Sequence, residues 1–406
     1  MYGDLAQYLL TKLTMSCCEG GKSCDLTAKI NDSKPAEVIN NVKEYYGKVL
    51  RSSKDLKTNA CCSGNSMPKH IRQALGLVHD EVIAKYYGCG LVIPDCLSTC
   101  NVLDLGSGSG RDCFVLSKLV GSTGKVTGID MTDEQLEIAR KYIDYHQEKF
   151  GYTESNVVFL KGFIEQLGEA GLQDNTFDII VSNCVVNLSP DKTAVLKESF
   201  RVLKAGGELY FSDVYADQNL PKEVRENKIL WGECIAGALY WKDLHKIAAE
   251  VGFTEPRLVD VSPVTVDNEV LQNIVGEAKF VSATYRLFKI QDQKAEETQV
   301  MYNGTIVECN DKFVLDIHNA YKTGEIAQVD ADVAAILQNT RFSDYFTFCP
   351  PGASKTLPAN DFKQDVMVNP FAFMIESTNN TKGIDDTAIC CDGSFDKKEC
   401  NSAAIQ

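Results

Sequence analysis

The sequence predicts an α/β protein whose main domain is built on a doubly wound, mostly parallel β-sheet. Short apolar runs, typical of buried strands, alternate with longer segments of helical periodicity. A glycine-rich turn directly follows the first of these runs, 101–105. Asp130 ends the second run, twenty residues after Gly110. Together these features are typical of a βαβ unit that binds a nucleoside.

Two helical segments are expected before this alternation begins. Pro35 opens the first, and its apolar positions keep helical spacing to about Arg51. The second extends from about Pro68 to Tyr87 and is ended by glycine. The residues before both, 1–34, are predicted to be a flexible tail that contains cysteines. The chain thus begins with a helical N-terminal segment.

The alternating region follows, and we expect it to complete a main domain over 35–290. Parallel strands are predicted at 101–105, 125–129, 156–160, 177–182 and 207–212, with closing strands at 256–264 and 279–289. Helices are predicted at 111–120, 132–149, 163–170, 191–204, 221–236 and 241–251. Helices of this length between strands favour a parallel sheet that is covered on both faces.

A change of pattern predicts a second, smaller domain. A stretch rich in Gln, Lys and Glu, 291–299, reads as a linker. Beyond it, a pair of strands at 300–307 and 312–317 and a helix at 331–337 predict a small α+β C-terminal domain over 300–376. The remaining residues, 377–406, are expected to form a second flexible tail with cysteines.

Composition narrows the class of protein. The 406 residues are 44% hydrophobic, which is enough for two or three packed domains. A net charge of −15 argues against nucleic acid or an anionic membrane as partner. No leader-like segment or apolar run near the ~20 residues of a membrane span is seen. We therefore expect a cytoplasmic protein whose sixteen cysteines are largely reduced.

The glycine turn is compatible with more than one ligand. Gly106, Gly108 and Gly110 let the backbone approach a ligand that a β-carbon would push away. Asp130 is placed to accept hydrogen bonds from a ribose. A dinucleotide site needs a further glycine where this chain has Arg111, so the pyrophosphate fingerprint is broken. The turn resembles instead the first motif of class I S-adenosylmethionine methyltransferases, and a tightly packed turn without ligand is the alternative.

Several cysteines are expected near this site. Ligands of open α/β sheets bind beyond the carboxyl ends of the strands. Cys184 lies just past 177–182, and Cys234 follows the next strand by one helix, while Cys61 and Cys89 lie on the N-terminal segment. Converging thiolates suit a soft, polarisable acceptor. A free cysteine is, however, often only a small buried hydrophobe, and we expect this of Cys96, Cys100, Cys113, Cys309 and Cys349.

Several segments resemble the arsenite S-adenosylmethionine methyltransferases, and the resemblance spans roughly 40–375. The segments are 86–94, 103–113, 126–131, 182–184, 206–213, 231–234 and 280–284. The glycine motif alone would fit any class I methyltransferase, whereas the contexts of the cysteines are specific to this family. The resemblance implies a Rossmann-like class I methyltransferase fold, S-adenosylmethionine as cofactor and no structural metal.

The resemblance also implies roles for individual residues. The arsenic-binding thiols of the family match Cys89, Cys184 and Cys234. Its additional redox thiol matches Cys61, with the adjacent Cys62 as the alternative. The implied cofactor contacts are Tyr87, Asp104, Gly106, Gly108, Gly110, Asp130, Met131, Ile164, Glu165 and Asn183.

The implied reaction is transfer of a methyl group to thiolate-bound trivalent arsenic. The substrates would be thiol conjugates of arsenite and then of methylarsenite, in arsenic detoxification. A disulfide between Cys61 and Cys89 would return electrons to arsenic, and thioredoxin or glutathione would reduce that disulfide. The enzyme is expected to be a monomer that binds neither nucleic acid nor membrane.

Two other functions are weighed against this one. A methyltransferase that acts on carbon, such as a quinone enzyme, would need an apolar pocket and a proton-accepting residue, not convergent thiols. A protein that only sequesters metalloids would explain the cysteines. It would not explain the glycine turn together with Asp130.

Overall fold

The computed structural model describes residues 35–46, 67–88, 90, 92–291, 295–349 and 367–380. Several predictions lie outside these ranges: the N-terminal cysteine-containing tail, the C-terminal tail beyond residue 380, the end of the first helix, Cys61, Cys62 and Cys89. Residues 377–380, predicted as the start of the C-terminal tail, form the end of a helix instead. Within the described residues, none of the helices has the length and apolar character needed to cross a bilayer.

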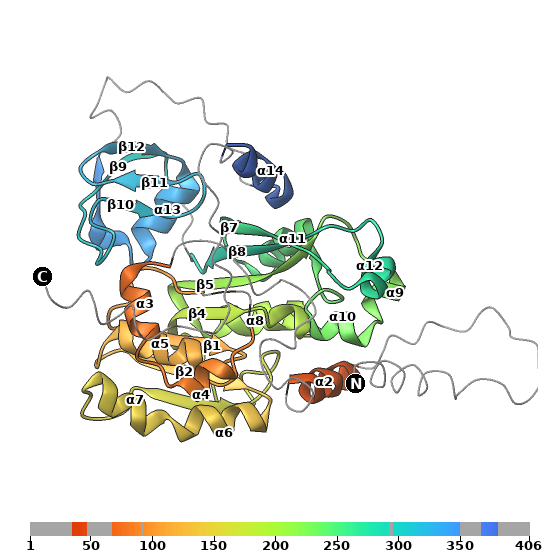
Figure 1. The fold of residues 1–406 in the computed structure, drawn as a ribbon. Coiled ribbons are helices and arrows are strands. Elements are labelled where there is room, and N and C mark those ends of the chain that lie inside the picture. Colours follow the sequence, from red (N-terminus) through yellow and green to blue (C-terminus); the bar gives the residue numbers. More distant parts are fainter. Residues whose placement is uncertain are drawn as a thin grey trace, which may run out of the picture. The chain divides into compact units, whose positions relative to one another are not determined.

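A mixed β-sheet forms the centre of the main domain (Figure 1). Its strand order is β3-β2-β1-β4-β5-β8-β7, and β6 pairs with β5 at one end. The strands from β3 to β5 are parallel, whereas β8 is antiparallel to both β5 and β7. The bounds are β1 Asn101–Leu105, β2 Lys125–Asp130, β3 Val157–Lys161, β4 Phe177–Asn183, β5 Leu203–Ala216, β6 Leu239–Tyr240, β7 Arg257–Val264 and β8 Phe280–Phe288. The predicted doubly wound, mostly parallel sheet is confirmed.

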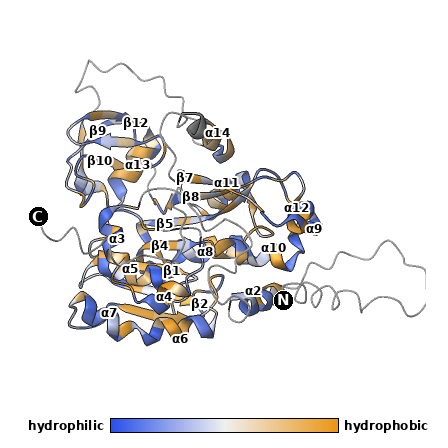
Figure 2. Cartoon of the chain, viewed as in Figure 1, coloured by the Kyte–Doolittle hydropathy of each residue, from blue (hydrophilic) through white to orange (hydrophobic). Residues whose placement is uncertain are grey.

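The strands form where the sequence supplies apolar side chains to both faces of the sheet. Val102 and Ile179 pack into one hydrophobic core, while their neighbours Leu103 and Ile180 pack into another. This alternation follows from the period of two along a strand. Because helices cover both faces, the inner strands are almost continuously apolar. Figure 2 shows hydrophobic colour along these strands and hydrophilic colour on the outer helix α7.

The helices divide between the two faces of the sheet. One core takes side chains from α3 Lys69–Leu75, α4 Asp80–Ala84, α5 Arg111–Val120, α6 Asp133–Lys141 and α7 Ile143–Phe150. The opposite core takes them from α8 Lys192–Val202 and α11 Trp241–Val251. A third core lies near the carboxyl ends of the strands and includes residues of α2 Pro35–Glu44, α9 Lys222–Arg225, α10 Lys228–Gly232 and α12 Glu269–Val275.

Four helix predictions differ from the structure. The segment 221–236 is divided into α9 and α10, because the Asn227 side chain accepts the Ile229 and Leu230 N–H groups and starts a new helix there. The helix predicted over 68–87 is divided into α3 and α4, because the His79 imidazole accepts the Glu81 N–H and starts a new helix there. The segment 132–149 is likewise divided, at Tyr142, into α6 and α7. The segment 163–170 is not a helix. It forms consecutive tight turns that include a Gln166 N–H to Phe163 O bond of 3.1 Å.

The C-terminal region contains two small sheets. β9 Thr298–Tyr302 pairs antiparallel with β12 Ile326–Val329 and β13 Phe346–Cys349, while β10 Lys312–Val314 pairs with β11 Ala320–Lys322. The predicted pairing of 300–307 with 312–317 is therefore wrong, since a turn at Gly304, where φ is +75°, ends the first strand early. The predicted helix is confirmed as α13 Ala331–Asn339.

The last described helix, α14 Pro370–Asn380, contacts β7 and β8 of the main sheet. Its residues Phe371, Phe373 and Met374 pack against the same core as α8 and α11. The chain therefore passes from the main sheet to the small sheets and back again.

Candidate active site

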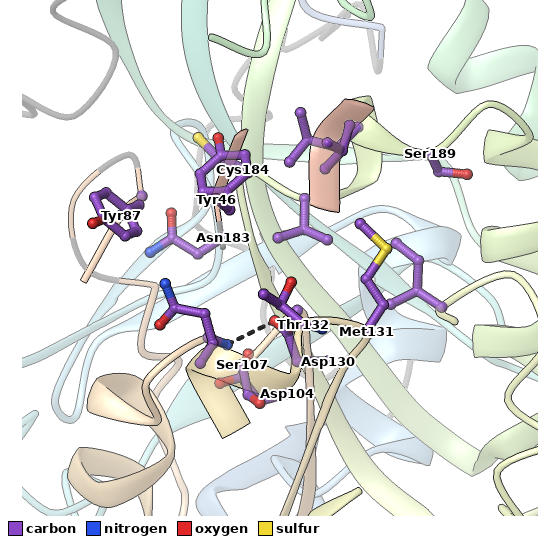
Figure 3. A pocket seen from close by; sticks show the side chains of 18 of the residues that line it. Tyr46, Tyr87, Asp104, Ser107, Asp130, Met131, Thr132, Asn183, Cys184 and Ser189 are labelled. Atoms are coloured by element: carbon purple, nitrogen blue, oxygen red, sulfur yellow. Dashed lines mark hydrogen bonds between the residues drawn. The ribbon is translucent and has the colours of Figure 1, made fainter. Parts of the chain in front are cut away.

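The site lies where the order of strands along the sheet reverses. The chain runs from β1 outward through β2 to β3, then returns to place β4 on the other side of β1. In open α/β sheets this reversal leaves a crevice beyond the carboxyl ends of the two central strands. A cavity occupies that position, and the segments that follow β1, β2 and β4 line it (Figure 3).

The glycine turn after β1 forms one wall of the cavity. Gly106 has φ of +70°, and a β-carbon there would lie 2.4 Å from a methyl carbon of Val185. The N–H groups of Gly106 and Ser107 both donate to the carbonyl oxygen of Ile129, at 2.8 and 3.0 Å. Only glycine fits at position 106, because both the backbone angle and the close contact exclude a side chain.

The Asp130 carboxylate joins this turn to the end of β2. Its Oδ2 atom accepts the Gly108 N–H at 2.9 Å, and its Oδ1 atom accepts the Thr132 N–H at 2.8 Å. Burial raises the pKa of Asp130, and the bonds from these two N–H groups oppose the rise. Each carboxylate oxygen has a second lone pair, so the group can still accept hydrogen bonds from a ligand.

Asp104 lies within β1, where it is buried and lines the cavity. The Cys113 thiol donates to its Oδ2 atom at 3.1 Å. Burial, and next the nearby Asp112, raise the pKa of Asp104 well above its ordinary value. The sequence predicts only a packing role for Cys113. Cys113 therefore has a second role, as a hydrogen-bond donor to Asp104 in the cavity wall.

Asn183, at the end of β4, holds the segment that follows Cys89 in sequence. Its Nδ2 atom donates to the carbonyl oxygen of Gly90 at 3.0 Å and to the Tyr86 hydroxyl at 2.6 Å. Arg111 donates to the same Gly90 carbonyl at 2.8 Å, and its guanidinium lies 3.1 Å from the centre of the Tyr86 ring. Arg111, which breaks the dinucleotide fingerprint, thus fixes a loop instead.

Two of the predicted arsenic-binding cysteines meet in this cavity. Cys184 follows β4 directly, and Cys234 follows α10. Both are buried and line the cavity, and the Cys234 thiol donates to the Cys184 carbonyl oxygen at 3.1 Å. Both have left-handed backbones, with φ of +54° and +62°, which is strained for a residue with a β-carbon. Cys184 is disulfide-bonded in this structure.

Helix α2 closes the cavity beside Cys234. The Tyr45 hydroxyl donates to the buried Glu233 carboxylate at 2.5 Å, and the Tyr46 hydroxyl donates to the Gly232 carbonyl at 2.7 Å. The rings of Tyr46 and Tyr87 meet edge to face at 5.7 Å. The N-terminal segment is therefore attached to the residues immediately before Cys234.

A partly buried cation and a buried carboxyl group stabilise the loop after β4. The Lys192 ammonium donates to the carbonyl oxygens of Asn187 and Ser189, at 3.3 and 3.0 Å. Burial lowers the pKa of Lys192 to about 8, against attraction to Asp213. Burial raises the pKa of Asp213 to about 7, although it accepts the Asn187 N–H at 2.8 Å. These bonds fix the chain that carries Cys184.

The structure brings most of the predicted site residues together. Those that line the cavity are Tyr87, Asp104, Gly106, Gly108, Asp130, Met131, Ile164, Glu165, Asn183, Cys184 and Cys234. Gly110 caps α5, with φ of +86°, and packs against Phe159. Cys61 and Cys89 lie outside the described residues.

Sequence reasoning missed other residues of the lining, among them Tyr46, Ser107, Thr132, Gln135, Ser189 and Glu233. Ser107 and Thr132 stand next to predicted contacts in sequence, which is a usable signal. Glu233 likewise stands next to Cys234, whereas no pattern singled out Tyr46, because packing of the N-terminal segment brings it to the cavity from a distant position.

The lining fits a polar nucleoside ligand. The Ser107 hydroxyl and the Gln135 side-chain oxygen are buried at the cavity and have no hydrogen-bond partner among the described residues. Buried polar atoms without a partner are costly unless a ligand or water satisfies them. Across the described ranges, no group of three or more metal-ligating side chains has the arrangement of a metal site.

The strand order, the glycine turn and the Asp130 carboxylate define an S-adenosylmethionine-dependent methyltransferase. The family model of the methyltransferase domain matches residues 97–252, and that of the arsenite methyltransferase C-terminal domain matches residues 295–400. The chain is 50% identical to human (Homo sapiens) arsenite methyltransferase over 374 residues, covering 90% of this chain and 99% of that protein.

Two further relatives agree with these matches. Arsenite methyltransferase from the bacterium Aquipseudomonas alcaligenes is 52% identical over 312 residues, covering 76% of this chain and 90% of that one. The crystal structure of an arsenic (III) S-adenosylmethionine methyltransferase from Chlamydomonas reinhardtii superposes with a TM-score of 0.68 at 44% identity, covering 71% of this chain and 98% of that chain. The chain belongs to the arsenite methyltransferase family.

Proposed function

We propose that this enzyme transfers methyl groups from S-adenosylmethionine to trivalent arsenic, acting first on arsenite and then on methylarsenite as thiol conjugates. The observation that carries the proposal is the meeting of Cys184 and Cys234 in the cavity that the glycine turn and Asp130 line. The names of the relatives support arsenic as the substrate.

Different residues of the cavity are proposed to bind different parts of the cofactor. S-adenosylmethionine supplies an electrophilic methyl group on a positively charged sulfur atom. Asp130 is the proposed acceptor for the ribose hydroxyls, since its oxygens retain free lone pairs. Asp104 and Asn183 are proposed near the charged methionine end. The unpartnered Ser107 and Gln135 oxygens supply further polar contacts.

The thiols hold the substrate. Soft thiolate ligands suit arsenic, and we assign the three positions of arsenite to Cys89, Cys184 and Cys234. Arsenic bound in this way keeps a lone pair, which attacks the methyl group. No general base is required, because the bound nucleophile carries no proton. Catalysis would then consist of positioning and exclusion of water.

A redox step must follow the first transfer before a second can begin. The arsenic lone pair becomes the new As–C bond, so arsenic is oxidised formally from trivalent to pentavalent. Attack of a free thiolate on one arsenic-bound sulfur forms a disulfide, and the electron pair of the broken As–S bond returns to arsenic and restores the trivalent state. We assign this disulfide to Cys61 and Cys89, with thioredoxin or glutathione as the reductant.

The redox chemistry also indicates the cellular compartment of the enzyme. Thiols that must be reduced after each turnover suit a reducing compartment. We therefore propose a cytoplasmic, monomeric enzyme of arsenic detoxification.

Formation of S-adenosylhomocysteine in the presence of arsenite, with a thiol reductant, tests the proposal. We expect turnover that depends on arsenite and yields methylated arsenic by chromatography. Arsenite binding without turnover would leave only a metalloid-binding protein. Turnover with a quinone but not with arsenite would instead indicate a methyltransferase that acts on carbon. Cys309→Ser serves as the control, because Cys309 is absent from the cavity lining.

A further inference from the structure

A thiol outside the proposed arsenic site makes direct contact with the wall of the cofactor cavity. Cys113, in the first turn of α5, is fully buried, and its Sγ atom donates to Oδ2 of Asp104 at 3.1 Å. Asp104 is itself buried and lines the cavity beside Ser107 and Asp130 (Figure 3). The proposed function gives this thiol no part in binding arsenic or in its reduction.

The sheet leaves a space for the sulfur atom next to Asp104. Asp104 on β1 is paired with Gly128 on β2, and glycine has no side chain to fill the surface of the sheet at that point. A β-carbon on Gly128 would lie 2.8 Å from the Cys113 sulfur and 2.8 Å from the β-carbon of Ser107. The sulfur atom therefore occupies the place that a side chain at 128 would take, and close packing keeps it turned toward Asp104.

The protonation of the two groups favours the same contact. Burial, and next the nearby Asp104, raise the pKa of the Cys113 thiol well above its ordinary value, so the sulfur keeps its proton and acts as the donor. Burial, and next Asp112, raise the pKa of Asp104, whereas the bond from Cys113 and the charge of Arg111 oppose this rise. The thiol therefore favours the ionised carboxylate, which is the form that attracts a positive charge.

The two buried carboxyl groups of this wall differ in how they are held. Asp112 accepts bonds from Arg111 at 2.7 Å and from Asn183 at 3.2 Å. The Asp104 carboxylate accepts the Cys113 thiol at Oδ2, and the described residues form no other hydrogen bond to it. A bond at Oδ2 restricts rotation of the carboxylate, so the direction of Oδ1 depends on Cys113.

We propose that Cys113 is a positioning residue for S-adenosylmethionine, because its thiol orients the Asp104 carboxylate toward the charged methionine end of the cofactor. This inference rests on the proposed function, which places Asp104 near that end. The thiol acts through Asp104 and does not itself line the cavity. Its loss should therefore weaken recognition of the methionine end and leave recognition of the adenosine end unchanged.

Binding measurements on the full-length chain separate this role from a general effect on the fold. The probe 5′-methylthioadenosine keeps the adenosine and the sulfur atom of the cofactor but lacks the amino acid end. We expect Cys113→Ala and Cys113→Val to raise the Kd for S-adenosylmethionine at least about fivefold. The Kd for 5′-methylthioadenosine should stay within about twofold. Cys113→Ser keeps an O–H donor, so both values should stay within about twofold of wild type.

Two further variants serve as controls for packing. Valine fills the space of the sulfur atom, so Cys113→Val provides a packed variant without a donor if Cys113→Ala unfolds. Cys100 is a buried thiol of the same hydrophobic core, but it donates to the Cys96 carbonyl oxygen and not to a residue of the cavity. Cys100→Ala should change neither Kd, and thermal midpoints identify which variants are folded.

Asp104→Asn separates the two levels of inference. If Asp104→Asn binds S-adenosylmethionine normally, the placement of Asp104 in the proposed function is wrong. If Asp104→Asn weakens binding but folded Cys113→Val does not, the role of Cys113 is wrong and the placement of Asp104 stands. An equal rise in Kd for both ligands in Cys113→Val would also overturn the role, since a distorted glycine turn predicts that result.

A double variant tests whether the thiol acts through Asp104. Once the Asp104 carboxylate is absent, its orientation no longer matters, so adding Cys113→Val to Asp104→Asn should not raise the Kd further. Additive losses in the double variant would show that Cys113 affects the cofactor by another route, and the proposal would then be wrong.

Discussion

The Cys234 thiol lies 3.1 Å from the backbone carbonyl oxygen of Cys184, although the two residues are fifty positions apart in sequence. The contact joins the loop after β4 to the loop after α10, and both loops line one cavity. Two thiol positions are therefore set by the fold of the main domain itself. The remaining candidates, Cys61 and Cys89, come from the segment that precedes the sheet in sequence.

This division predicts different needs for the two substrates. Methylarsenite has only two exchangeable positions, because carbon occupies the third, and we assign these to Cys184 and Cys234. Cys184→Ser and Cys234→Ser should each lose methylation of both arsenite and methylarsenite. Cys61→Ser should lose activity on arsenite but keep activity on methylarsenite. Initial rates with each substrate provide the measurement.

The result could contradict this assignment in two ways. Normal arsenite methylation by Cys61→Ser would move the redox role to Cys62 or another thiol. Activity of Cys184→Ser on either substrate would show that the site itself is misplaced. Cys100→Ser is a suitable control, because this buried thiol, which contacts the Cys96 carbonyl oxygen, is not part of the cavity lining.

Asp130 should govern affinity for the cofactor. Loss of one charge-assisted hydrogen bond costs about 1.5–3 kcal/mol, so Asp130→Ala should raise the Kd for S-adenosylmethionine by roughly tenfold to a hundredfold. Calorimetric titration measures this directly. Asp133→Asn is the control, because this half-exposed carboxylate pairs with Lys161 at 2.7 Å. An unchanged Kd in Asp130→Ala, with the fold intact, would disprove the ribose assignment.

His146 should make stability depend on pH. Its ring stacks on Phe114 at 3.6 Å, Nδ1 lies 2.7 Å from the Tyr142 carbonyl oxygen, and Nε2 accepts the His79 N–H at 3.2 Å. The neutral imidazole satisfies both nitrogens. Burial lowers the pKa of His146 to about 4 from 6.5, so the folded state binds fewer protons than the unfolded state between these values. Stability from this group is complete above pH 6.5 and is lost as pH falls toward 4.

The corresponding measurement is urea denaturation at pH 7 and pH 5. From the two pKa values, His146 should account for about 2 kcal/mol of the decrease in unfolding free energy between these conditions. His146→Gln should lack that part of the decrease, whereas a variant of the exposed His318 should retain it. Equal decreases in wild type and His146→Gln would show that His146 does not titrate in this way.

The cysteines of the C-terminal tail should be dispensable for chemistry. Helix α14 packs Phe371 and Met374 against the main core and extends to Asn380, so the truncation belongs after residue 380. Such a chain should keep its maximal rate of methylation. A second truncation that also removes α14 should lower the thermal midpoint, because apolar surface of the core becomes exposed. A folded chain ended after residue 380 that cannot methylate would place the tail in the site.

Much of the fold could be predicted because its signals are local. β1 and α5 were predicted with their observed bounds, since an apolar run, a glycine turn and a helical repeat follow one another directly. The partner of β9 could not be predicted. Its neighbours β12 and β13 lie far along the chain, and strand pairing depends on packing that no short pattern records. The segment 163–170 has the apolar residues of a helix, yet it forms turns.

In the site, too, residues placed by a local pattern could be predicted, whereas contacts between distant segments could not. Asp104 and Asp130 could be placed because the end of a parallel strand fixes the position of the residue there. The contact of Tyr45 with Glu233 joins residues 188 positions apart, and no pattern within either segment indicates the other. The resemblance to a family identified the cysteines, but it did not indicate their left-handed backbones.

The left-handed backbones of Cys184 and Cys234 lower the stability of the fold at the two positions that carry the proposed arsenic ligands. Glycine adopts φ near +54° or +62° without strain, whereas a residue with a β-carbon there costs about 1–3 kcal/mol. Glycine at 184 or 234 would relieve this strain, but each substitution would also remove a buried sulfur atom from the cavity. An engineer who seeks a hardier catalyst should hold both cysteines constant and mutate elsewhere.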